Sequence, residues 1–370
     1  MEMEPDGICA IRARAIKQLD GLSASAERHS GPITSWIDPT EVYRGSDPGV
    51  DVRRVQFDLH GFVVIRGFLP AAGCEEQIAT MLALIEGWDP QRENPATFRT
   101  DEKQSDAQGS SDYFLDSADR VHFFAEVDAV DKDGNLRSDV TKATALNKVG
   151  HGIHLKDGVF SQYCNSPQIV ELVHSLGWKD PVVPQSMYIF KQPRIGGEVT
   201  SHQDSTFLYT APRQSCLGLW LALQPATLMN GCLWVRPGSH RESVRRAFCR
   251  NPAFFELGDT SAPQMIFEAE PLTPTSNGVP WEGKLPEGSW PPPCEGLVAA
   301  GFVPVECAAG DLVVFPGTLD HLSLPNYSAE SRHKFQLHLV EGPAQGIEWS
   351  RRNWLQYKPG SAFHKLGSPL

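Results

Sequence analysis

The sequence predicts a mainly β protein with flanking helices, on two observations. From residue 181 onward, short runs rich in β-branched and aromatic residues are separated by Gly, Pro and Asn, which is typical of a β-sandwich or barrel. Before that point, two segments place apolar residues at helical spacing. The chain has 370 residues, of which 41% are hydrophobic and 21% charged, as in ordinary folded globular proteins. We therefore expect strands to form the core and helices to pack outside it.

The chain divides into a short extension and one large domain. Residues 1–50 are rich in Ser, Gly, Pro and mixed charge, and we expect a partly ordered N-terminal extension there. Residues 51–370 form the main domain. Within it, the stretch at about 250–305 is heavy in Pro and Gly, which predicts a long surface insertion between two strands.

The elements of the domain follow in order. Residues 60–69 (HGFVVIRGFL) have the composition of a strand, and a helix is expected directly after Pro70. Its apolar face would hold Ile78, Met81, Leu82 and Ile85. A second helix should begin at Pro167, capped by Asn165 or Ser166. The later strands are expected within SMYIFKQP, CLGLWLAL, GCLWVRPGS, DLVVFPG and KFQLHLV.

Charge and cysteine usage exclude several functions. A formal net charge of -12 disfavours binding to nucleic acid or anionic lipid, and the eight cysteines contain no Cys-x-x-Cys pair that would suggest a zinc ribbon or a redox site. The acidic N-terminus does not resemble a signal peptide, no segment is long enough to span a bilayer, and the C-terminal GSPL lacks the basic residue of a peroxisomal signal. We expect a cytoplasmic protein, more readily a monomer, that acts on a small molecule.

The segment SHQDSTFLYT (residues 201–210) contains a candidate metal motif. On a strand, His202 and Asp204 would face the same way, with Gln203 on the opposite face. A non-haem iron site needs two histidines and one carboxylate. The best candidate for the second histidine is His321, because it follows the strand DLVVFPG and a turn. Asp320 is a competing ligand of lower rank.

A co-substrate site is expected beside this metal. A 2-oxo acid chelates iron through its keto and C1-carboxylate oxygens, and its far carboxylate needs a cation such as arginine. Arg332 begins the strand after the turn that carries His321, and Ser323 lies two residues past that histidine. An arginine in this position can equally be an ordinary surface residue.

Several motifs together resemble the phytanoyl-CoA dioxygenase family. They are NKVGHGIHLKDGVF, QSMYIFKQP, GGEVTSHQDSTFLYT, LGLWLAL, NGCLWVRPGSH and the segment 321–332, and the similarity spans roughly residues 55–355. The order and spacing of these motifs are most similar to those of the phytanoyl-CoA dioxygenase domain-containing proteins within that family. The resemblance implies a double-stranded β-helix, a cupin-like jelly roll with the iron site in its mouth.

The resemblance also implies a reaction and a set of site residues. The family couples oxidative decarboxylation of 2-oxoglutarate, to succinate and carbon dioxide, with hydroxylation of a small-molecule or lipid-like substrate. Its cofactors are Fe(II), 2-oxoglutarate and dioxygen, with ascorbate as a candidate accessory reductant. The implied iron ligands, which are also the catalytic residues, are His202, Asp204 and His321. The implied contacts of 2-oxoglutarate are Lys148, Met187, Trp220, Ser323 and Arg332.

Two other functions stay open at this point. The chain could be a non-catalytic jelly-roll protein that binds metal and 2-oxoglutarate, which would then consume no 2-oxoglutarate. It could also be a cupin-like metal hydrolase or isomerase, active with zinc or manganese and no oxo acid. The primary substrate is not indicated, since one fold hosts many substrates.

Overall fold

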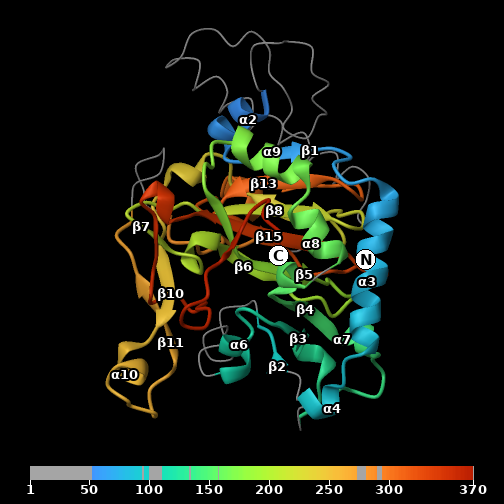
Figure 1. Cartoon of the computed structure of the whole chain (residues 1–370). Helices are drawn as coiled ribbons and strands as arrows, with labels where there is room; N and C mark the ends of the chain where they lie inside the picture. The colour runs from blue at the N-terminus through green and yellow to red at the C-terminus, as the bar shows by residue number, and fades with distance from the viewer. Residues whose placement is uncertain are drawn as a thin grey trace.

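The computed structural model describes residues 52–93, 96–99, 111–132, 135–156, 158–272, 281–289 and 294–369. The N-terminal extension expected at residues 1–50 lies outside them. The described part is built on two β-sheets and a set of covering helices, which Figure 1 shows with their labels.

The larger sheet has nine strands, and all pairs but one are antiparallel. Its order is β1 (Val63–Ile65), β13 (Leu312–Pro316), β8 (Leu217–Ala222), β15 (Lys334–Glu341), β5 (Pro181–Ile189), β4 (Leu146–His151), β3 (Val121–Ala125) and β2 (Ala96–Thr97), with β17 (His364–Lys365) also pairing β5. The strands expected from the sequence at β5, β8, β13 and β15 are therefore confirmed. The strand expected at residues 60–69 is only three residues long, because the helix α2 (Val52–His60) occupies the preceding positions.

The smaller sheet has four strands and lies over the inner face of the larger one. Its order is β12 (Val303–Val305), β9 (Leu233–Val235), β14 (His321–Ser323) and β6 (Val199–His202). Side chains from both sheets share one buried core, for example Trp220 and Val313 of the larger sheet with Trp234 of the smaller. Two antiparallel sheets packed over a common core make this a jelly roll, as expected.

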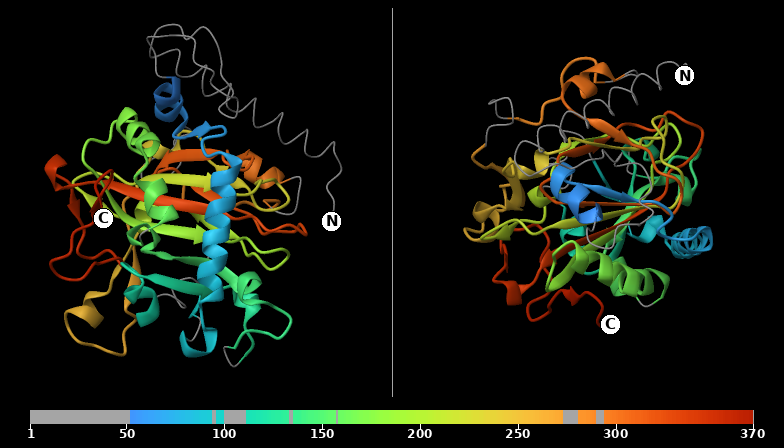
Figure 2. Two further views of the ribbon diagram at one scale, coloured as in Figure 1. Left: turned by 45° about the vertical axis from the view of Figure 1, so that its right-hand side comes forward. Right: turned by 90° about the horizontal axis from the view of Figure 1, so that it is seen from above.

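Helices cover the outer face of the larger sheet, where Figures 1 and 2 show α3 lying across the strands beside α8 and α9. These three helices are α3 (Ala71–Glu86), α8 (Val159–Cys164) and α9 (Pro167–Ser175). Elsewhere in the described part lie the shorter helices α4 (Pro90–Glu93), α6 (Asp112–Asp116), α7 (Lys142–Ala145), α10 (Pro252–Phe255) and α11 (Glu295–Ala299). Short 3₁₀ turns follow at η1 (Val127–Ala129), η2 (Ile153–Leu155), η3 (Asp204–Thr206), η4 (Ser239–Arg241) and η5 (Pro343–Gln345).

The two helices expected from the sequence, α3 and α9, are both present and contribute to a second core outside the larger sheet. The hydroxyl of Ser166 accepts a hydrogen bond from the Ile169 amide and caps α9, with Pro167 in its first turn. Met81 and Ile85 of α3 are buried. Leu82, which the sequence placed on the same face, is 43% exposed because it projects from the edge of that face.

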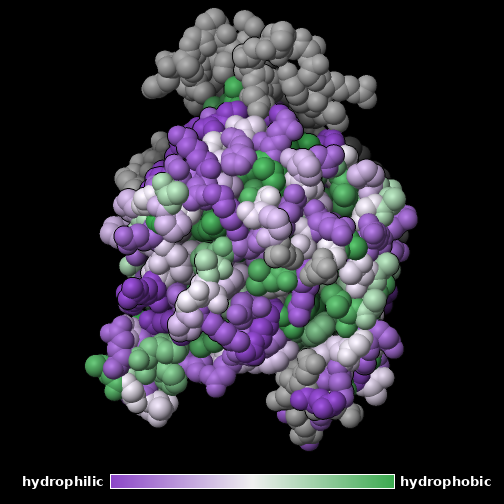
Figure 3. All heavy atoms as spheres, viewed as in Figure 1, coloured by the Kyte–Doolittle hydropathy of each residue, from purple (hydrophilic) through white to green (hydrophobic). Residues whose placement is uncertain are grey.

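The Pro/Gly-rich stretch at 250–305 is partly regular. The strands β10 (Arg246–Arg250) and β11 (Met265–Ala269) pair as a hairpin that projects from the body of the molecule and carries α10 (Figure 1). Figure 3 shows apolar side chains at this projecting end, where Phe255 and Leu257 are exposed. A second two-stranded antiparallel sheet is formed by β16 (Glu348–Trp349) and β7 (Thr210–Ala211). None of the described helices is long and apolar enough to cross a membrane.

Candidate metal centre and co-substrate pocket

The three predicted metal ligands meet at one edge of the smaller sheet. His321 begins β14 and pairs directly with His202, the last residue of β6. Asp204 does not lie on the strand, as the sequence suggested, but opens the 3₁₀ turn η3. This turn brings the carboxylate round toward both imidazoles. Gln203 is directed elsewhere and its amide donates to the carbonyls of Ser243 and Thr318.

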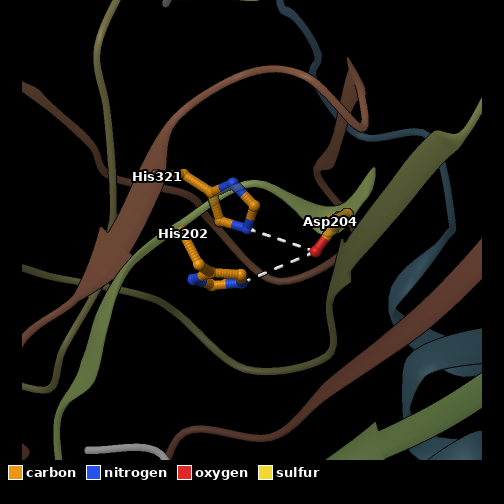
Figure 4. A group of neighbouring side chains, drawn as sticks. All are labelled: His202, Asp204 and His321. Carbon is orange, nitrogen blue, oxygen red and sulfur yellow. Dashed lines mark ion pairs between the residues drawn. The ribbon is translucent and has the colours of Figure 1, made fainter. Parts of the chain in front are cut away.

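The ligand atoms of this group converge, as Figure 4 shows. The Nε2 atoms of His202 and His321 lie 3.5 and 3.6 Å from Oδ1 of Asp204. All three potential ligand atoms lie within 4.8 Å of one another, and among the described residues this is the group of His, Cys, Asp and Glu side chains that could hold a metal ion. Two imidazoles and one carboxylate form the facial set that non-haem iron uses.

Hydrogen bonds fix the orientation of both imidazoles. Nδ1 of His202 lies 2.8 Å from the Thr200 carbonyl, and Nδ1 of His321 lies 3.0 Å from the Leu319 carbonyl. Because a carbonyl oxygen can only accept, each Nδ1 carries the proton and each Nε2 keeps its lone pair. Burial lowers the pKa of His321 to about 4, so this ring is neutral at neutral pH. Three electron-pair donors thus face one point, an arrangement that a cation stabilises.

His338 orients the carboxylate of Asp204 from behind. Its Nε2 lies 2.9 Å from Oδ2 of Asp204, and its Nδ1 lies 2.9 Å from the amide nitrogen of Gln185. Burial alone would raise the pKa of Asp204, but His338, His321 and His202 outweigh it and hold this pKa well below its usual range. Asp204 therefore stays ionised and keeps Oδ1 directed at the two imidazoles.

The contribution of His338 was missed in the sequence, although a signal exists. In KFQLHLV the polar residues Lys334, Gln336 and His338 alternate with apolar ones, so they share one face of β15. A strand that is buried along its length places polar side chains on one face only where they have a ligand or partner. All three of these side chains line the pocket beside the metal site.

We expect His338→Phe to weaken metal binding roughly tenfold to a hundredfold, the usual cost of removing a residue that orients a ligand. The reason is that Asp204 would lose the bond that holds its carboxylate in place. Anaerobic titration with Fe(II) measures the affinity. His333→Phe is the matched control, because His333 is also buried but bonds the Tyr188 hydroxyl instead. Equal affinities for His338→Phe and His333→Phe would contradict this role.

The competing ligand Asp320 is directed away from the metal site. Its carboxylate accepts hydrogen bonds from Ser201, Arg236 and Arg245, at 2.6 to 3.2 Å. Burial would raise its pKa, but the two arginines lower it overall, so Asp320 is an ionised group that is already paired. It is thereby excluded as the preferred ligand.

The predicted co-substrate residues surround the same cavity as the metal ligands. This cavity is lined by all eight predicted site residues, namely Lys148, Met187, His202, Asp204, Trp220, His321, Ser323 and Arg332. Met187 of β5 and Trp220 of β8 face it from the two strands that flank β15, while the Ser323 hydroxyl donates to the Gly231 carbonyl at 2.8 Å. The structure therefore brings the predicted residues together around one cavity.

Arg332 is buried and has no anionic partner in the part of the chain that the structure describes. It is 2% exposed, its guanidinium carbon lies 5.4 Å from the Trp220 ring centre, and its Nε has no hydrogen-bond partner among the described residues. Its backbone is fixed by two bonds with the backbone of Lys191. Burial lowers the pKa of Arg332 to about 10, which still leaves it charged at neutral pH. A buried, unpaired guanidinium beside a cavity fits a carboxylate-bearing ligand.

Lys148 adds a second buried basic side chain. Its Nζ lies 3.7 Å from the Met187 sulfur and 3.2 Å from the Phe98 ring centre, and burial lowers its pKa to about 7. It is not a surface lysine. Positive charge in this part of the cavity is consistent with a site for an anion.

Four aromatic and histidine side chains that precede the metal ligands in the sequence pack or form hydrogen bonds within the protein. Phe114 lines the cavity, whereas Phe123 stacks on Trp88 in the outer core. His151 also borders the cavity and bonds the Ser117 hydroxyl, and His154 bonds Ser186.

Comparison with known proteins identifies the family. A family model described as Phytanoyl-CoA dioxygenase (PhyH) matches residues 57–334. The Bos taurus protein named Phytanoyl-CoA dioxygenase domain-containing protein 1 is 40% identical over 312 residues, which are 84% of this chain and 96% of the relative. The Oryza sativa subsp. japonica protein named Phytanoyl-CoA dioxygenase 1 is 39% identical over 302 residues, with 82% and 92% covered.

The fold comparison agrees. The crystal structure of EctD from S. alaskensis with bound Fe superposes with a TM-score of 0.51 at 18% identity, covering 89% of this chain and 92% of that one. A likeness at this identity concerns the fold, which is the jelly roll described above. The chain therefore belongs to the phytanoyl-CoA dioxygenase family, a family of dioxygenase enzymes.

Proposed function

We propose that this protein is an Fe(II)- and 2-oxoglutarate-dependent dioxygenase that hydroxylates a small-molecule or lipid-like substrate. Besides the hydroxylated substrate, the reaction would give succinate and carbon dioxide from oxidative decarboxylation of 2-oxoglutarate. One observation carries the proposal. Three electron-pair donors, His202, Asp204 and His321, line a cavity that is also lined by the buried Arg332, which has no ion pair among the described residues.

The residues fit the cofactor that the family implies. His202, Asp204 and His321 would hold Fe(II), since neutral imidazole and carboxylate are its usual ligands. When bound with 2-oxoglutarate, the iron supplies the dioxygen activation that the hydroxylation requires. The protein's part is to keep both Nε2 atoms unprotonated, through the Thr200 and Leu319 carbonyls, and to keep Asp204 ionised through His338.

The co-substrate would lie between the metal ligands and Arg332. The guanidinium fork matches a carboxylate in a bidentate manner, so Arg332 would bind the far carboxylate of 2-oxoglutarate. Trp220 and Met187 would flank the carbon chain and exclude water, and the Ser323 hydroxyl and Lys148 would contribute further polar contacts. The dry surroundings strengthen each of these electrostatic contacts.

The decisive experiment is succinate formation from 2-oxoglutarate by anaerobically iron-loaded protein after air is admitted. The expected result is succinate that depends on iron, on dioxygen and on 2-oxoglutarate, with ascorbate tested as an optional reductant. Protein that binds iron and 2-oxoglutarate but forms no succinate, even across a broad panel of candidate substrates, would support the non-catalytic alternative. Activity with zinc or manganese and no oxo acid would support the hydrolase or isomerase alternative.

A further inference from the structure

Lys334 is a further lysine that lines the cavity beside the metal ligands. It is the first residue of β15 and pairs across the sheet with Ile189 of β5, which in turn pairs with Lys148 of β4. Residues paired in this way point to the same face of a sheet. Lys334 and Lys148 therefore lie in one row on the inner face, two strands apart, and both line the cavity that contains the metal ligands.

Lys334 and Arg332 both lie beside the Trp220 ring. The Nζ of Lys334 lies 5.3 Å from the centre of the Trp220 ring, and the Arg332 guanidinium carbon lies 5.4 Å from the same centre. The Lys334 ammonium donates a hydrogen bond to Oε1 of Gln336, at 2.9 Å. In the part of the chain that the structure describes, Lys148, Arg332 and Lys334 form no ion pair with any carboxylate.

The acidic side chains at the cavity are already engaged. Asp204 is surrounded by three histidines, and Glu126 interacts with Asn147 and Lys191. Burial and the neighbouring Arg332 hold the pKa of Lys334 well below its usual range. Like charges crowded into one buried cavity disfavour the protonated lysines, and an anion that binds between them restores and stabilises their charge.

We propose that Lys334 binds the C5 carboxylate of 2-oxoglutarate together with Arg332, and so makes the site selective for dicarboxylic 2-oxo acids. The inference rests on the proposed function and adds a residue and a selectivity to it. Arg332 supplies the planar fork, and Lys334 supplies a point charge on a flexible stem that can approach the same carboxylate from the neighbouring β15 position. A 2-oxo acid with a methyl group in place of the C5 carboxylate gains nothing from Lys334.

The test compares two ligands and measures binding rather than turnover. Dissociation constants of 2-oxoglutarate and 2-oxopentanoate are measured by anaerobic calorimetry on the Fe(II)-loaded protein, for wild type, Lys334→Met and Lys334→Arg. The Lys334→Met variant should bind 2-oxoglutarate roughly tenfold to a hundredfold more weakly than wild type, because a charge-assisted hydrogen bond is lost. Binding of 2-oxopentanoate should stay unchanged, which also shows that the variant is folded, and Lys334→Arg should retain most of the 2-oxoglutarate affinity.

Lys365→Met is the matched control for charge. Lys365 is an exposed lysine that pairs with Asp180 outside the cavity, so its loss removes the same charge without touching the site. If Lys334→Met weakens both oxo acids equally, or neither, the assignment of Lys334 to the C5 carboxylate is wrong. Failure of the wild-type protein to bind 2-oxoglutarate at all would instead contradict the proposed function on which the inference rests.

Discussion

Asp204→Asn is expected to reduce iron-dependent succinate formation to the level of protein without iron. The substitution replaces the one anionic ligand by a neutral amide of nearly the same shape. It also lets an NH₂ group face the Nε2 atoms of His202 and His321, both of which are expected to be acceptors. The site would lose the charge that attracts a divalent cation and the geometry of three converging donors. Anaerobic Fe(II) titration, followed by succinate measurement after air is admitted, checks both effects.

Asp311→Asn is the matched control for this substitution. Asp311 is also a buried aspartate, 2% exposed, but it pairs with Arg66 and accepts a hydrogen bond from the Gly67 amide outside the cavity. Its loss should lower the free energy of unfolding and leave iron affinity unchanged. An Asp204→Asn protein with wild-type succinate formation would show that the three residues do not form the metal site.

The metal ligands could be predicted in part because each carries a local signal. His202 and Asp204 stand two apart, and His321 follows a strand and a turn. Their meeting was not predictable from spacing, since the register that pairs His202 with His321 joins segments over a hundred residues apart. The turn that carries Asp204 was missed for a different reason. The sequence has strand composition up to this point, and the end of β6 is set by packing against β14.

The residues behind the metal ligands also carry a signal in the sequence, from which the face that lines the cavity could have been predicted. The alternation of Lys334, Gln336 and His338 along β15 was visible in the sequence, and it marks the face that lines the cavity. What the alternation cannot give is the partner of each side chain. That His338 contacts Asp204, while Asp320 is turned toward two arginines, depends on how the sheets pack over one another.

Arg332→Met should raise the 2-oxoglutarate concentration needed for half-maximal succinate formation roughly a hundredfold to a thousandfold, because a bidentate charge-assisted contact is lost. The maximal rate at saturating 2-oxoglutarate should change little, since the guanidinium is not among the metal ligands. The backbone bonds between Arg332 and Lys191 do not involve the side chain and would hold the segment before β15 in place. Steady-state rates over a range of 2-oxoglutarate concentrations provide the measurement.

Arg332→Met should weaken co-substrate binding but increase the stability of the ligand-free protein. Arg332 is charged and buried without an anion, so replacing it with an apolar side chain of similar length should raise the free energy of unfolding of the ligand-free protein. Arg236→Met is the control, since Arg236 is also largely buried but pairs with Glu242 and Asp320. Its loss leaves buried carboxylates with fewer partners and should destabilise by roughly 3 kcal/mol. Chemical denaturation without ligand separates the two cases. If Arg332→Met destabilised as Arg236→Met does, Arg332 would be held by a partner within the protein, and its assignment to a carboxylate of the co-substrate would lose its physical basis.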